Sequence, residues 1–210
     1  MTSRTARVLA LLLSAGATGC RHLLEPIEPR SLSIAESEAV RFPEGTAAWI
    51  ENAHTERLLT PILTEGLHTI EADLREWTAR LVSEVGRELG RRGVAVYIPE
   101  SSLRGTSIAL EPVPPLPADP ATFRKLRLRV SGLEPPRAGH GEGPRIRAEV
   151  ESEDGKFTAA YAAGVGARGF RDALFDLKKM ILDDGALHSW LRNAPSPTAG
   201  AAGAMKAMKG

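Results

Sequence analysis

Hydrophobic residues recur at intervals of three and four over residues 67–89, a spacing typical of an amphipathic helix. The apolar stripe comprises Leu67, Ile70, Leu74, Trp77, Leu81, Val85 and Leu89. Arg91 and Arg92 follow, and Gly93 can supply the left-handed cap, so the helix is expected to end there. The β-branched run over residues 94–98, closed by Pro99, predicts a strand directly after the helix.

Strict alternation of apolar and charged residues marks the middle of the chain. Residues 125–130 and 145–151 both alternate in this way, which predicts two half-buried strands. Asp154-Gly155 favours a hairpin turn, and residues 156–163 predict the returning strand. Helical spacing reappears over residues 170–184, followed by a last apolar patch at 187–191.

Residues 48–63 contain buried-type side chains without a clear period; a short strand would account for them, but Pro61 argues against a central strand there. The other predicted helices and strands indicate an α/β fold of the α+β kind, arranged as a two-layer sandwich. In this arrangement a mostly antiparallel sheet of four or five strands buries one face beneath two helices. About 190 residues remain after a leader-like start, which suits one domain with tails.

The first residues form a separate unit with a different composition. Arg4 and Arg7 give a cationic start, residues 8–17 are almost entirely apolar, and small residues precede Cys20. This order is typical of a secretory signal with a small-residue cleavage site. The apolar run spans roughly 15 Å as a helix, which is too short for a permanent membrane span.

Ala17-Thr18-Gly19-Cys20 resembles the lipobox of bacterial lipoproteins, although that family prefers Leu at the position of Ala17. The resemblance implies cleavage by signal peptidase II before Cys20 and a lipid on its sulfur. Cys20 is the only cysteine, so no internal disulfide accounts for it. Arg21, where the family's sorting pattern would place Asp for retention, implies the outer membrane. An ordinary signal peptide cut elsewhere and an uncleaved anchor remain alternatives.

These boundaries divide the chain into four parts. Residues 1–19 are expected to be a signal peptide and 20–47 a lipid-anchored flexible tether. Residues 48–193 are expected to form a periplasmic α/β domain, and 194–210 a disordered tail. The order of elements over residues 60–185 also resembles small periplasmic domains of envelope-assembly lipoproteins, including the lipopolysaccharide-assembly and penicillin-binding-protein activator classes; no functional residue follows from that resemblance.

Four arginines lie on two of the predicted strands, residues 125–130 and 145–151. The chain carries 27 Lys+Arg and 26 Asp+Glu, so no global attraction to nucleic acid is expected. Arg127, Arg129, Arg145 and Arg147 point away from the expected helix-covered face and could contact an anionic ligand. The alternative is a solvated face on which these arginines pair with Glu149, Glu151 or Glu153.

No other pattern specifies chemistry. The sequence from Gly164 to Gly169 matches G-x-G-x-x-G, but it follows a hairpin strand and precedes no further parallel strand, so no nucleotide is expected. The five histidines lack the spacing of zinc ligands, so neither a metal nor a cofactor is expected. No nucleophile, base and orienting group can be assembled by spacing, and no catalytic residue is expected. The role of the proline-rich loop 111–120 stays open.

The leading hypothesis is a non-enzymatic, lipid-anchored envelope protein, bound to the membrane through lipidated Cys20 and acting as an accessory or assembly subunit with a protein partner. A second hypothesis is a module that binds anionic glycolipid or peptidoglycan through the four arginines. A third is an envelope hydrolase whose catalytic residues lie far apart in sequence.

Overall fold

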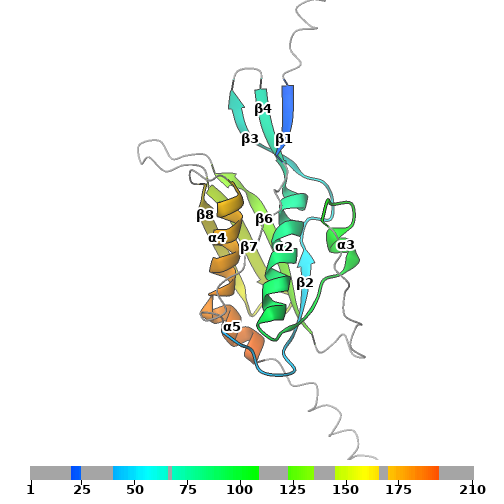
Figure 1. Ribbon diagram of the computed structural model, residues 1–210, viewed down its shortest axis with the longest axis vertical. Coiled ribbons are helices and arrows are strands. Elements are labelled where there is room, and N and C mark those ends of the chain that lie inside the picture. The colour runs from blue at the N-terminus through cyan, green and yellow to red at the C-terminus, as the bar shows by residue number, and fades with distance from the viewer. Residues whose placement is uncertain are drawn as a thin grey trace, which may run out of the picture.

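The alternating strands and the two amphipathic helices form two packed layers (Figure 1). A computed structural model describes residues 20–24, 40–65, 68–108, 123–134, 145–165 and 170–193. The larger of its two sheets has five strands in the order β5-β2-β6-β7-β8. These strands are β2 (Ala47–Asn52), β5 (Ala95–Tyr97), β6 (Arg124–Glu134), β7 (Arg145–Ser152) and β8 (Thr158–Gly164).

Two helices cover one face of this sheet, as the sequence predicts: α2 (Leu74–Arg91) and α4 (Phe170–Leu182). The remaining described helices are α3 (Glu100–Leu103), beside β2, and α5 (Gly185–Arg192), which follows α4. The α+β two-layer sandwich is therefore confirmed. The patch expected at 187–191 is the buried side of α5, on which Leu187 and Leu191 are fully buried.

The sheet is mixed, however, which corrects the expectation of a mostly antiparallel sheet. β2 pairs in parallel with both β5 and β6, whereas the β6–β7 and β7–β8 pairs are antiparallel. The parallel pairing of β2 with β5 arises because the chain returns through α2, a crossover that parallel neighbours require. Neither the strand at 47–52 nor this crossover was resolved by the sequence pattern.

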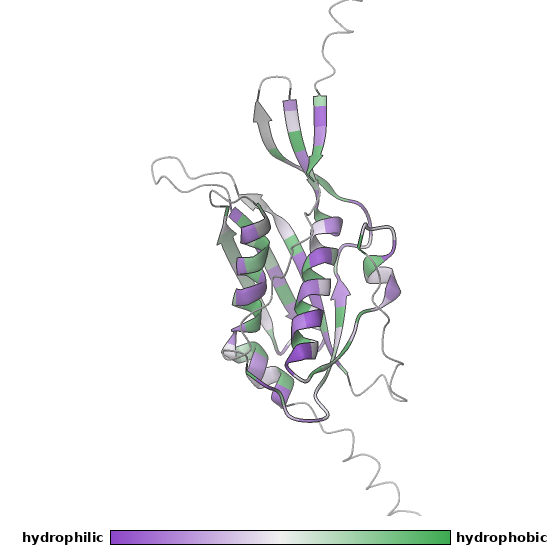
Figure 2. Ribbon diagram, in the orientation of Figure 1, coloured by the Kyte–Doolittle hydropathy of each residue, from purple (hydrophilic) through white to green (hydrophobic). Residues whose placement is uncertain are grey.

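The core lies between the sheet and the helices. The alternating apolar residues of β6 and β7 point into it, and all are at most 2% exposed: Leu126, Leu128, Val130, Ile146, Ala148 and Val150. In Figure 2 hydrophilic and hydrophobic residues alternate along α2 and α4, as amphipathic helices require. At Gly86 a Cβ atom would lie 2.8 Å from Ile98 Cδ1, so the glycine allows α2 to approach the chain after β5 closely.

A second, three-stranded sheet projects from the end of the sandwich at which α2 begins (Figure 1). It consists of β1 (Cys20–Leu24), β4 (His68–Asp73) and β3 (Leu59–Glu65), in the order β1-β4-β3. β1 is parallel to β4, and β3 is antiparallel to it. Pro61 lies on an edge strand next to a register shift, where a strand tolerates proline.

The expected helix over 67–89 is correct in its body and wrong at its start. Residues 68–73 form a strand, and α2 begins at Leu74 because Asp73 caps it, accepting a hydrogen bond from Arg75 N at 3.1 Å. At the other end Gly93 has φ +92°, which confirms the expected glycine after the helix. Gly155 likewise has positive φ in the confirmed turn between β7 and β8.

The expected flexible tether over residues 20–47 contains ordered segments in its described parts, although residues 40–46 form neither helix nor strand. Cys20–Leu24 is a strand, and Phe42 is 7% exposed in the core and donates its backbone N–H to Arg92 O at 2.9 Å. The expected signal peptide 1–19, tail 194–210 and proline-rich loop 111–120 lie outside the described residues.

Charged side chains are buried where α2 faces α4. Lys178 Nζ lies 3.5 Å from Glu84 Oε2, and their side chains are 2% and 5% exposed. Burial lowers the pKa of Lys178, an effect that the attraction of Glu84 only partly offsets. Arg92, also fully buried, donates from Nη1 to Leu182 O at 2.8 Å. These contacts fix the register between the helices, since an unpaired charge would be costly there.

Asp184 joins α5 to the sheet. Its Oδ1 accepts from Ala186 N at 2.7 Å and Leu187 N at 3.2 Å, and its Oδ2 accepts from the Tyr161 hydroxyl at 2.6 Å. Burial alone would raise the pKa of Asp184, but the Tyr161 hydroxyl and the two backbone N–H groups outweigh it and hold the pKa below its usual value. Burial and Asp184 in turn raise the pKa of Tyr161.

Asp184→Ala is expected to lower the free energy of unfolding at neutral pH by about 1 to 2 kcal/mol, the usual value of a helix cap. Because the folded-state pKa of Asp184 is lowered, its contribution is present above the unfolded-state pKa of about 3.9 and is lost as the pH falls through the folded-state value. Urea unfolding at neutral and acidic pH measures both effects. The exposed Asp176→Ala variant is the control, and equal losses in the two variants would contradict the role of Asp184.

Candidate functional site

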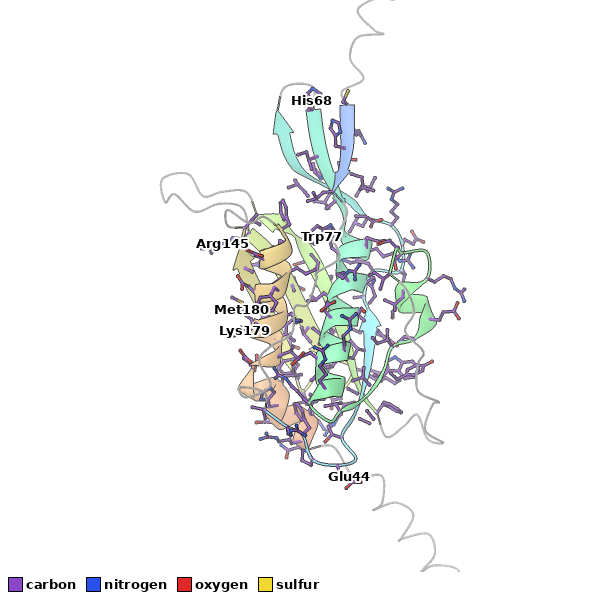
Figure 3. All side chains as sticks on the ribbon, in the orientation of Figure 1. Glu44, His68, Trp77, Arg145, Lys179 and Met180 are labelled. Carbon is purple, nitrogen blue, oxygen red and sulfur yellow. The ribbon has the colours of Figure 1, made fainter. Side chains whose placement is uncertain are left out.

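Cys20 is the first residue of β1 and lies at the outer end of the small sheet. Its side chain is exposed, and no hydrogen bond or disulfide in the described part of the chain involves it. In the parallel register of β1 and β4 it stands opposite His68, the residue that begins β4. Figure 3 labels His68 at this pole of the molecule and Glu44 at the opposite one. The sulfur is therefore accessible at one extremity of the fold.

Two histidines accompany Cys20 on β1 and β4. His22 Nε2 lies 3.3 Å from His68 Nδ1, and the rings are stacked with centroids 5.6 Å apart. Arg21, on the other side of β1, lies 3.3 Å from Glu71 Oε1 with 75% of its side chain exposed. The outer end of the small sheet is therefore polar on both sides.

The inner end of β1 is fixed to the sandwich. Trp77 Nε1 donates to Leu24 O at 3.2 Å, and the Leu24 side chain packs against the core. Trp77, labelled in Figure 3, lies in the first turn of α2 and is 4% exposed. Cys20 is thus separated from the core by the length of one short strand.

The second candidate site is the face of the five-stranded sheet opposite α2 and α4. Arg127, Arg129 and Arg147 are exposed on it, as the alternation predicts. The register, however, places glutamates opposite the arginines of β6: Arg127 faces Glu151, and Arg129 faces Glu149. The arginines of β6 and β7 are therefore not directly opposite one another, and glutamates separate their charges.

Ion pairs run across this face from β6 to β7, to β2 and to the turn after β7. Arg129 Nη2 contacts Glu149 Oε2, Arg127 Nε lies 3.4 Å from Glu51 Oε2, and Lys125 Nζ lies 3.0 Å from Glu153 Oε2. The expected pairing of sheet arginines with acids is therefore found for Arg129, whereas Arg127 pairs with a residue of β2. A face balanced in this way attracts anions weakly.

Arg147 and Arg145 lie further along β7, opposite Gly132 and Glu134. Hydrogen bonding by Arg129 is the main reason why the pKa of Glu149 is below its usual value; burial acts against it, and Ser131 and the charges of Arg129 and Arg147 add to the lowering. Glu149 is accordingly ionised at neutral pH and offsets positive charge from both strands. Arg145, labelled in Figure 3, begins β7.

A shallow cavity of about 420 Å³ opens on the same face. It is lined by Glu51, Asn52, Ala53, Thr55, Arg127, Arg129, Glu149 and Glu151. Acidic and basic groups alternate around the cavity. The Asn52 side chain is fixed by a hydrogen bond from its Nδ2 to Arg75 O at 3.0 Å. The cavity could accept a polar ligand that offers both donors and acceptors, rather than a simple anion.

The sequence reasoning missed Glu51 and an aromatic group at the β5 edge of this face. The rings of Trp49 and Tyr97 lie 4.3 Å apart, and Phe123 lies 6.4 Å from each of them. Trp49 Nε1 donates to Glu51 Oε1 at 2.6 Å. The signal was present in residues 47–52, where buried Ala48, Ile50 and Asn52 alternate with outward-facing residues.

The other sequence patterns bring no further site together. β8, which leads into the G-x-G-x-x-G match, is antiparallel to β7, unlike the strand of a dinucleotide fold, and residues 166–169 lie outside the described part. His54 and His188 contact backbone carbonyls of Val130 and Leu182. Among the described residues no group of three or more metal-ligating side chains occurs, and none of their helices is long and apolar enough to span a membrane.

Arg129→Gln is expected to raise the pKa of Glu149 towards about 4.3, its value in a model peptide. The free energy of unfolding should fall by less than about 1 kcal/mol, since the pair is half-exposed. Titration of the Glu149 carboxyl by NMR measures the shift, and Lys156→Gln, at the β7–β8 turn, serves as the control. An unchanged Glu149 titration would contradict the assigned pairing.

No protein family model, curated protein or solved structure matches this chain.

Proposed function

We propose that this protein is a bacterial envelope lipoprotein, held at the membrane by a lipid on the sulfur of Cys20. The observation that carries the proposal is the placement of the only cysteine of the chain. Cys20 directly follows a leader-like sequence, and its side chain is exposed at one pole of the fold. A thiol there is accessible to a modifying enzyme and to a lipid surface without rearrangement of the core.

The modification has a defined chemistry. The thiol loses its proton, and the sulfur forms a thioether bond with a glyceryl carbon of a phospholipid, whose phosphate-bearing headgroup leaves. Hydrolysis of the peptide bond between Gly19 and Cys20 then makes the lipidated cysteine the first residue. Two acyl chains give stable membrane attachment, whereas one chain gives only reversible binding.

The domain then serves as a non-enzymatic accessory or assembly subunit of an envelope complex, facing the periplasm from the outer membrane. The face of the five-stranded sheet opposite α2 and α4, here called the charge-paired face, supports this role. No described element covers it, and the aromatic pair Trp49–Tyr97 at its β5 edge is of the kind enriched at protein interfaces. Paired charges on such a face favour specificity for one partner over affinity for any anion.

The cavity beside Arg127 and Arg129 suits a ligand that offers donors and acceptors besides its charge, which supports a second candidate, a binding module for anionic glycolipid or peptidoglycan. The two candidates differ in one experiment. Replacement of Arg127, Arg129, Arg145 and Arg147 by Gln would abolish co-purification of glycolipid with the module. In an assembly subunit the same variant would retain its stoichiometric protein partner at high salt.

Metabolic labelling with a palmitate analogue tests the anchor. The wild-type protein is expected to become labelled and to fractionate with membranes, and Cys20→Ala is expected to lose both properties completely. His22→Ala, next to the anchor on β1, is the matched control and should retain the label. Equal labelling of Cys20→Ala and wild type would refute the proposal.

A further inference from the structure

We infer that the small sheet of β1, β4 and β3, here called the stalk sheet, fixes the lipid anchor rigidly to the domain and turns this pole of the molecule towards the lipid surface. This inference rests on the proposed lipidation of Cys20 and adds an interaction surface to it. It replaces a flexible attachment, in which the domain would be free to rotate, with one defined orientation.

The pairing of β1 carries the first step. All five residues of β1 have partners on β4, from Cys20 opposite His68 to Leu24 opposite Ala72. The strand is also held from the side and from below, by the Arg21–Glu71 ion pair and by the hydrogen bond from Trp77 to Leu24 O. The anchor residue is therefore already part of the folded structure.

The segment after β1 cannot act as the spacer between lipid and domain, because both of its ends are attached to the domain. Leu24 is bound at the start of α2 through Trp77, and Phe42 is bound at the end of α2 through Arg92 O. These points lie about 22 Å apart along the helix, since α2 rises about 1.5 Å per residue. Residues 25–39 thus join two places on the domain.

The geometry of β4 sets the height of the domain. His68 lies opposite both Cys20 and Glu65, so the anchor and the outer ends of all three strands share one level. From His68 to Asp73, the cap of α2, the strand rises about 17 Å. A polar headgroup layer is about 5 to 8 Å thick, so the stalk sheet would hold the sandwich clear of the lipid.

The chemistry of the outer end fits headgroups rather than hydrocarbon. His22, His68 and Arg21 are exposed there, and each would be costly to bury in an apolar layer. A fully flexible attachment over residues 20–47 would reach a mean distance of about 30 Å, of the same order but with no fixed orientation. Strand register and orientation, rather than distance, therefore distinguish the two cases.

Paired cysteines test whether β1 is docked in the lipidated protein. Leu23 and Glu71 are directly opposite in the register, so Leu23→Cys/Glu71→Cys should form a disulfide nearly completely in palmitate-labelled protein isolated from membranes. The mismatched pair Leu23→Cys/Thr69→Cys is displaced by two residues and should form little. Electrophoresis without reductant and mass spectrometry of the linked peptides measure both.

A second matched pair, Arg21→Cys/Thr69→Cys, covers the case in which the first variant fails to fold. Equal cross-linking of matched and mismatched pairs, or none in either matched pair of labelled protein, would overturn the stalk sheet while leaving lipidation intact. Absence of the palmitate label would instead overturn the proposed function and, with it, the orientation towards lipid.

Discussion

The junction at Asp73 is the constraint on which the arrangement of this molecule depends. β4 passes into α2 without a connecting loop, and Asp73 is both the last residue of the strand and the cap of the helix. The same carboxylate accepts from Leu58 N at 3.2 Å and lies 3.3 Å from Arg57 Nε, which ties the start of β3 to the junction. The stalk sheet therefore cannot turn independently of the sandwich.

This junction relates the two candidate sites to each other. Cys20 lies at the outer end of the stalk sheet, whereas the charge-paired face belongs to the five-stranded sheet. If the anchor fixes one pole at the membrane, as proposed, the charged face stands away from the lipid and stays accessible to the proposed partner. The buried contacts between α2 and α4 keep the sandwich rigid enough to transmit that orientation.

Much of the sandwich could be predicted from the sequence because its elements are half-buried. Leu126 and Val150 alternate with charged neighbours, and this period of two reports a sheet with one solvated face. The stalk sheet could not be predicted in the same way. Ile70 continues the helical spacing of α2, so the pattern does not show that residues 68–73 form a strand. β1 pairs with β4, which is more than forty residues away in sequence, and no local pattern predicts such a pairing.

The charge-paired face could likewise be predicted from the sequence only in part. Alternation correctly placed Arg127 and Arg129 on the solvated side, but only the strand register decides that Glu151 and Glu149 stand opposite them. The pairing of Arg127 with Glu51 required β2, which lies beside β6 through a parallel pairing of strands distant in sequence. Charge composition alone could not distinguish a cationic patch from a neutral ladder.

The orientation of the lipidated protein on vesicles tests the central claim most directly. A fluorophore attached at Thr69→Cys in the stalk sheet, or at Glu44→Cys at the opposite pole, would be exposed to vesicles containing a headgroup-labelled quencher lipid. The account predicts strong quenching at position 69 and almost none at position 44. Equal quenching at the two positions would show that the domain rotates freely on its anchor and would contradict the account.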